Sequence, residues 1–90
     1  MKITFDPAKR DLTLRYRGLD FASAAEVFAG RHATAPDDRM DYGEDRFITI
    51  GVLAGRPVVI VWTPRGDSRR VISMRYAHAK EARRWRARLD

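Results

Sequence analysis

The spacing of apolar residues changes once along the chain, from a helical period to a strand period. The opening segment "KITF" alternates enough to predict a short strand. Between Asp6 and Gly30, apolar side chains recur every three or four positions, which predicts two amphipathic helices. In the first helix the apolar stripe consists of Ala8, Leu12 and Tyr16, and in the second the stripe expected to be buried consists of Phe21, Ala25 and Phe28.

Both predicted helices have recognisable ends. Asp6 stands directly before Pro7, and Asp20 stands before the second helix. A carboxylate in this position accepts hydrogen bonds from free backbone N–H groups, and proline at the first helical position lacks a donor in any case. Gly18 and Gly30 are expected to end the two helices.

The second part of the chain is rich in β-branched residues and predicts four strands and a final helix. The strands are expected in "RHATAPDD", "RFITIGVL", "RPVVIVWT" and "RRVISM". Short turn segments, "AGR" and "PRGDS", connect the last three. An apolar stripe on a C-terminal helix consists of Ala79, Ala82, Trp85 and Leu89. The predicted order is β-α-α-β-β-β-β-α, an α+β fold in which helices pack on an antiparallel sheet, with residues 1–90 forming one domain.

Alternation along "RRVISMRY" predicts which side chains of the last strand face the core. Residues expected on the core side are Ile72, Met74 and Tyr76. Those expected on the outward side are Arg69, Val71, Ser73 and Arg75. By the same alternation Arg70 falls on the core side. Ser73 and Arg75 would then present hydrogen-bond donors from a rigid strand.

Composition narrows the class of protein. The chain has 90 residues, 44% of them apolar, and no cysteine, so disulfides and thiolate chemistry are excluded. The two histidines are far apart in the sequence, which disfavours a zinc site, and we expect no metal or cofactor. Neither a signal peptide nor a run of about 18 apolar residues is found. We therefore expect a cytoplasmic protein with no membrane segment.

The net charge of +6 is concentrated at one end of the chain. Residues 1–64 hold nine basic and nine acidic residues, whereas residues 65–90 hold nine basic and three acidic. Most of the basic residues are arginine, which suits bidentate contacts to phosphate. The asymmetry indicates a polyanionic partner, which could be nucleic acid, an acidic membrane surface or an acidic protein. Codon preference for arginine in a GC-rich genome is the alternative explanation.

Four segments of the chain resemble the recurring motifs of the BrnT family of bacterial type II toxins. The family motifs are F-x-W-D-x-x-K, K-H-G-hydrophobic-S-F-x-E-A-x-x-V-F, E-x-R-hydrophobic-x-x-x-G and R-G-x-x-x-R-I-I-S-A-R-x-A-x-x-x-E-R. The similar segments here, in the same order, are "ITFDPAK", "YRGLDFASAAEVF", "EDRFITIG" and "RGDSRRVISMRYAHAKEAR". The departures from the motifs include the missing tryptophan and the residues Arg17, Asp20 and Met74, where the motifs have histidine, serine and alanine.

The resemblance implies a fold similar to RelE-like ribonucleases and cleavage of RNA that stops translation and growth. It also implies a ribbon-helix-helix antitoxin, an assembly of two toxins and two antitoxins, and contact with operator DNA only through the antitoxin. Motif positions of the family fall on Arg46, Arg70, Ser73, Arg75 and Glu81.

Cleavage of RNA without a metal ion needs a proton acceptor, charge stabilisation at the phosphate and a proton donor. The candidate catalytic residues are Arg75, Ser73, Arg46 and Glu81. The candidate RNA-binding residues are Lys9, Arg70, His78, Lys80, Arg83 and Arg84. His78 could also act as an acid or base.

Each of these assignments has a structural alternative. Arg75 could form a surface ion pair, Arg46 could pair with Glu44, and Glu81 could interact with a helix dipole. The whole chain could be a basic binding module without catalysis, or an inactive toxin that serves as a structural partner of its antitoxin.

Overall fold

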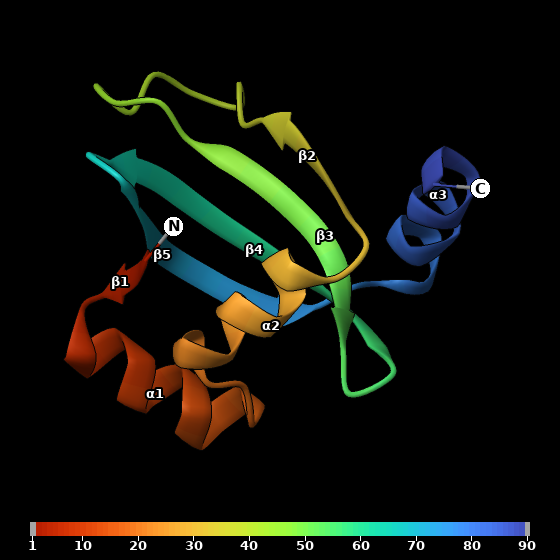
Figure 1. Cartoon of the computed structure of the whole chain (residues 1–90), viewed down its shortest axis with the longest axis horizontal. Helices are drawn as coiled ribbons and strands as arrows, with labels where there is room; N and C mark the ends of the chain where they lie inside the picture. The colour runs from red at the N-terminus through yellow and green to blue at the C-terminus, as the bar shows by residue number, and fades with distance from the viewer. Residues whose placement is uncertain (1, 90) are drawn as a thin grey trace.

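The computed structural model describes residues 2–89, in which a five-stranded sheet separates two groups of helices (Figure 1). The elements, in chain order, are β1 (Lys2–Phe5), α1 (Pro7–Arg17), the 3-10 turn η1 (Phe21–Ser23), α2 (Ala24–Ala29), β2 (His32–Pro36), β3 (Phe47–Leu53), β4 (Arg56–Arg65), β5 (Ser68–Tyr76) and α3 (Ala79–Leu89). In Figure 1, α1 and α2 lie below the strands and α3 stands apart from them at the right. The protein is therefore of the α+β class, as the sequence predicted.

The predicted caps of the N-terminal helices are confirmed. Asp6 accepts a hydrogen bond from the Ala8 N–H at 3.0 Å, and Gly18 ends α1 in the left-handed region with φ 70°. Asp20 likewise accepts from Ala22, but the turn that it caps is η1, which leads into α2.

The strands are ordered β1-β5-β4-β3-β2, and the sheet is mixed. The pairs β2–β3, β3–β4 and β4–β5 are antiparallel, whereas β1 runs parallel to β5. The prediction of an antiparallel sheet was therefore wrong at β1. A four-residue strand carries no local signal for its direction, because its partner is more than 60 residues away in the chain.

A β-bulge in β5 changes which side chains face the core. Trp62 pairs with Val71 and Val61 pairs with Ser73, so Ile72 is an extra residue without a partner on β4. An inserted residue breaks the two-residue alternation of a strand. Val71 and Met74 are both buried in the core as a result, and the prediction that Val71 points outward was wrong.

The same bulge reverses the predicted directions of Arg69 and Arg70. Arg69 lies on the core side of the sheet and Arg70 on the opposite side. The Arg69 guanidinium lies over the rings of Phe28 and Trp62, at 4.0 and 5.2 Å from their centroids, and so faces the helices. Arg70 lies between Arg69 and Val71 in the strand and therefore projects from the opposite face.

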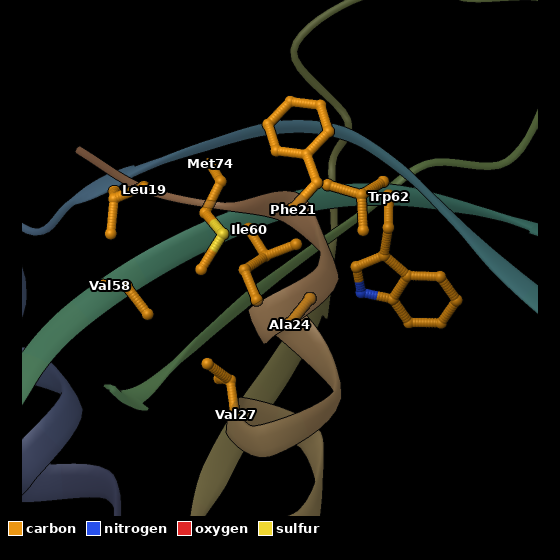
Figure 2. Close-up of a cluster of buried hydrophobic side chains, with 9 residues drawn as sticks. Leu19, Phe21, Ala24, Val27, Val58, Ile60, Trp62 and Met74 are labelled. Carbon is orange, nitrogen blue, oxygen red and sulfur yellow. The ribbon is translucent and has the colours of Figure 1, made fainter. Parts of the chain in front are cut away.

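The hydrophobic core fills the space between the sheet and the N-terminal helical layer (Figure 2). Its helical side consists of Leu19, Phe21, Ala24 and Val27, and its sheet side of Val58, Ile60, Trp62, Val71 and Met74. Ala25, predicted to be buried, is exposed. The 3-10 turn has about three residues per turn, which shifts the buried face by one position relative to a continuous α-helix.

Helix α1 lies at the margin of the sheet and has no buried residue. Ala8, Leu12 and Tyr16, predicted to form one apolar stripe, are all exposed. Polar contacts hold the helix instead: Arg10 binds Asp20 through Nε and Nη2 at 2.9 Å each.

Helix α3 covers part of the second face of the sheet, opposite the core. Trp85 and Glu81 line a pocket of about 270 Å³ with Ile48, Ile50 and Val59. Trp85 is only partly buried and Ala79 is exposed, while the side chain of Leu89 lies outside what the structure describes. None of the helices within residues 2–89 has the length and apolar character that crossing a membrane requires.

Candidate functional site

Three of the residues singled out from the sequence project from the second face of β5. Ser73 pairs with Val61 and Arg75 pairs with Val59, and both flank the buried Met74. Arg70 shares this face because the bulge at Ile72 restores it to the side of Ser73 and Arg75. The structure thus gathers on one strand a hydroxyl and two guanidinium groups.

Arg75 is joined to Glu81 of α3 by two short hydrogen bonds. Nη1 donates to Oε1 at 2.7 Å, and Nη2 donates to Oε2 at 2.8 Å. Nη1 also donates to the backbone oxygen of Tyr76 at 3.3 Å. The carboxylate therefore meets the guanidinium end-on, which fixes the orientation of a side chain that is still 36% exposed.

This end-on pairing leaves the Nε–Nη2 edge of the Arg75 guanidinium available. A guanidinium carries five N–H donors in one plane, and those on Nε and the outer side of Nη2 point in nearly the same direction. Within residues 2–89 no acceptor meets Nε of Arg75. The arrangement differs from the Arg10–Asp20 and Arg39–Asp37 pairs, in which the carboxylate occupies the Nε–Nη2 edge. Arg75 can therefore hold Glu81 and two oxygens of a phosphate group at once.

Glu81 has a second partner that ties the site to the start of α3. Its Oε1 accepts the backbone N–H of His78 at 2.9 Å, which is the return half of a capping box. The Arg75 guanidinium first, and the His78 N–H second, lower the pKa of Glu81 to about 2. In return the carboxylate raises the pKa of Arg75. At neutral pH both groups are charged, and the ionised carboxylate is a poor proton acceptor.

The remaining cations predicted on the C-terminal segment lie directly before α3 or within it. The exposed residues of this group are His78, Lys80, Arg83 and Arg84. Arg84 lines the α3 pocket together with Glu81, and the His78 backbone N–H donates to Glu81. These side chains extend the positive surface from β5 onto α3.

Within the described residues, neither Arg46 nor Lys9 forms a hydrogen bond or ion pair with Arg75 or Glu81. Arg46 donates from Nε to Glu44 at 3.2 Å and stacks on Tyr42, 4.0 Å from the ring centroid. Its hydrogen-bond partner is thus in the loop before β3, as the structural alternative expected. Lys9, on α1, lines a different pocket.

Arg39 is a further basic residue near the site that the sequence did not single out. Its guanidinium binds the buried carboxylate of Asp37 at 2.7 and 2.8 Å, and Tyr42 donates to the same carboxylate at 3.1 Å. These contacts, that of Arg39 foremost, lower the pKa of Asp37 to about 2. The positive charge of Arg39 also opposes the rise in the pKa of Arg75. The residues of "DDRMDY" looked like an ordinary polar loop, and no local pattern places Arg39 toward β5.

Across the described chain, no three histidine, cysteine or acidic side chains gather as they would around a metal ion.

The fold and the site define a small α+β protein with basic side chains on β5 and α3. The model of one protein family, "Ribonuclease toxin, BrnT, of type II toxin-antitoxin system", matches residues 5–81. The chain therefore belongs to the BrnT family, as the sequence motifs indicated. Membership implies an RNA substrate and an antitoxin partner at the level of the family. No curated protein matches the chain.

Proposed function

We propose that this chain is an endoribonuclease toxin that cleaves RNA without a metal ion and thereby blocks translation. The observation that carries the proposal is the Arg75 guanidinium, which Glu81 orients while one bidentate edge remains open beside Ser73. The family indicates the reaction class, and this geometry supports Arg75 and Ser73 as the proposed residues.

In the proposed reaction the ribose 2′-oxygen attacks the adjacent phosphorus and the bond from phosphorus to the 5′-oxygen breaks. The products are a 2′,3′-cyclic phosphate and a 5′-hydroxyl end. Arg75 binds two non-bridging oxygens and stabilises the charge that develops on them in the transition state. Ser73 donates a hydrogen bond from the same face of β5. Glu81 is a positioning residue, since its low pKa makes it unsuited to accept the 2′-proton.

His78 is the proposed proton carrier. It is exposed, it precedes α3, and its backbone N–H is fixed by the same Glu81 that orients Arg75. Histidine side chains gain and lose a proton near neutral pH, so one imidazole can accept the 2′-proton and return a proton to the 5′-oxygen.

The flanking cations are proposed to bind the RNA backbone on either side of the cleaved bond. Arg70 extends the surface along β5, and Lys80, Arg83 and Arg84 extend it along α3. Contacts of this type hold RNA through its phosphates and weaken as salt concentration rises.

The partner is proposed to be a ribbon-helix-helix antitoxin in an assembly of two toxins and two antitoxins, in keeping with a RelE-like toxin fold. The toxin would reach operator DNA only through that antitoxin. Size measurement of the co-expressed complex tests this stoichiometry.

Incubation of the purified protein with total RNA in the presence of a chelator tests the activity. We expect cleavage by the wild type, loss of cleavage by Arg75→Ala, and retained cleavage by Arg65→Ala. Arg65 is a suitable control because it is an exposed arginine paired with Glu44, remote from α3 in the chain. Salt-sensitive binding of RNA without any cleavage would instead show a binding module.

A further inference from the structure

Helix α1 exposes most of its apolar surface. The exposed fractions are 55% for Leu12, 41% for Leu14 and 74% for Tyr16. A short helix normally gains most of its stability by burying one face. In α1 that role is taken by its caps and by the Arg10–Asp20 ion pair. Leu12 and Tyr16 accordingly remain more than half exposed.

Two of these side chains border a pocket between α1 and β5. The pocket has a volume of about 300 Å³ and is lined by Leu12 and Tyr16 of α1, by Ile72 of β5 and by the core residue Phe21. Leu12 and Tyr16 are four residues apart and so form one ridge of the helix. Leu14 belongs to a different side of α1 and does not line the pocket.

The margin of β5 beside this pocket favours a helix as the occupant. β1 pairs with β5 only from Ser68 to Val71, so within the described chain the next residues have no strand on that side. Arg17 reaches across from α1 and donates from Nη1 to the backbone oxygen of Met74 at 3.0 Å. An added strand would have to displace Arg17, whereas a helix laid along the Leu12–Tyr16 ridge would not.

Charge indicates an acidic protein segment. Helix α1 carries four basic residues and one acidic residue, and Lys9 and Arg17 line the pocket. RNA would also be attracted by these cations, and Tyr16 offers one ring, but the aliphatic side chains of Leu12 and Ile72 offer neither a hydrogen-bond donor to phosphate nor a flat ring for a base. An apolar anchor flanked by carboxylates matches the surface better.

We propose that the α1–β5 surface, formed by Leu12, Tyr16 and Ile72 with Lys9 and Arg17 at its border, binds an acidic amphipathic helix of the antitoxin. The inference rests on the proposed function, because it requires a toxin with an antitoxin. One apolar side chain of that helix fills the pocket, and its carboxylates face Lys9 and Arg17. The bound helix then lies beside Ser73, two residues from Arg75 in β5.

The test measures the affinity of the antitoxin encoded beside this chain's gene for three purified variants by calorimetry. Leu12→Asp and Tyr16→Ala are each expected to weaken binding about tenfold or more, because each removes an anchor from the centre of the contact. Leu14→Asp is the matched control, an equally apolar residue of α1 outside the pocket, and is expected to change the affinity less than about threefold. Leu12 and Tyr16 are more than half exposed and Leu14 is 41% exposed, and circular dichroism checks that each variant is folded.

Equal affinities for the wild type, Leu12→Asp and Tyr16→Ala would overturn the inference. It would also be overturned if Leu12→Asp weakened RNA binding and left antitoxin binding intact, or if it only converted a dimer of the free toxin to a monomer. RNA cleavage by the same variants is measured separately and is expected to be unchanged. Absence of cleavage by the wild type would remove the proposed activity without affecting the binding result.

Discussion

The guanidinium of Arg75 on β5 and the carboxylate of Glu81 on α3 meet end-on, through Nη1 and Nη2 at 2.7 and 2.8 Å. This pair links β5 to α3, which follow each other in the chain with a short connection between them. Glu81 also accepts a hydrogen bond from the backbone N–H of His78. Arg75 can thus form the ion pair with Glu81 and still bind a phosphate group, because the two contacts use different edges of the guanidinium.

Replacing Arg75 with lysine should abolish most of the RNA cleavage. Lysine keeps the positive charge but is a point donor, and it cannot bind Glu81 and a phosphate bidentately at the same time. We expect a loss of about a hundredfold or more in the single-turnover rate, in the range found when a transition-state donor is removed. The matched control is Arg65→Lys, which should leave the rate unchanged. Similar rates for Arg75→Lys and the wild type would remove bidentate binding from the mechanism.

Replacing Glu81 with glutamine should lower the cleavage rate without changing the shape of its pH profile. The pKa of Glu81 is about 2, so the carboxylate is ionised throughout the range in which RNA cleavage is measured. Loss of orientation at Arg75 is expected to cost about tenfold in rate, as for a positioning residue. Rates measured from pH 5 to 9 test this. Disappearance of an acidic limb in Glu81→Gln, with its persistence in His78→Gln, would identify Glu81 as the base.

Acid should weaken the fold partly through the same carboxylate. The pKa of Glu81 is lower in the folded chain, about 2, than its ordinary value of 4.5. Its contribution to the free energy of unfolding is therefore complete above about pH 4.5 and is lost as the pH falls toward 2. We expect Glu81→Gln to cost about 1–2 kcal/mol at pH 7, since the pair is partly exposed, and the cost to shrink with acidification.

Urea unfolding of the wild type and Glu81→Gln at pH 7, 4.5 and 2.5 measures this difference. Glu26→Gln, in an exposed position of α2, is the control. The Asp37–Arg39 pair also loses its contribution to stability as the pH falls, because the pKa of Asp37 is likewise lowered to about 2. The wild type and Glu81→Gln both retain this pair. A stability difference that stays constant over the three pH values would contradict the prediction.

Gly51 should not tolerate a larger side chain. A Cβ atom at this position of β3 would lie 2.6 Å from Cγ1 of Val27 and 3.3 Å from the backbone oxygen of Arg31. Val27 is fully buried in α2, so the contact cannot relax freely. We expect Gly51→Ala to lower the free energy of unfolding by about 1–3 kcal/mol. Gly30→Ala, whose Cβ would meet its neighbours at 3.7 Å or more, should change it little; thermal unfolding of both variants distinguishes them.

The candidate site was only partly accessible to prediction from the sequence. Motif positions identified Arg75, Ser73 and Glu81, and the structure brings Arg75 and Glu81 into contact. The same motifs also selected Arg46, whose partner in the structure is Glu44. Arg39 was missed, because its approach to Arg75 depends on how an irregular loop folds over the sheet.

Sequence alone determined the features that depend on neighbours in the chain. These include the caps at Asp6 and Gly18, the β-branched strands and the concentration of basic residues in the last part of the chain. Each follows from backbone hydrogen bonding, side-chain shape or charge within a few residues.

Tertiary structure alone decided which faces these elements present. The bulge at Ile72 arises from the pairing of β5 with β4, and it moves Arg70 to the side of Arg75 and Val71 into the core. The position of α1 at the sheet margin leaves Leu12 exposed, although its spacing in the sequence is that of a core residue. Register and packing involve residues far apart in the chain, and periodicity within one segment carries no information about them.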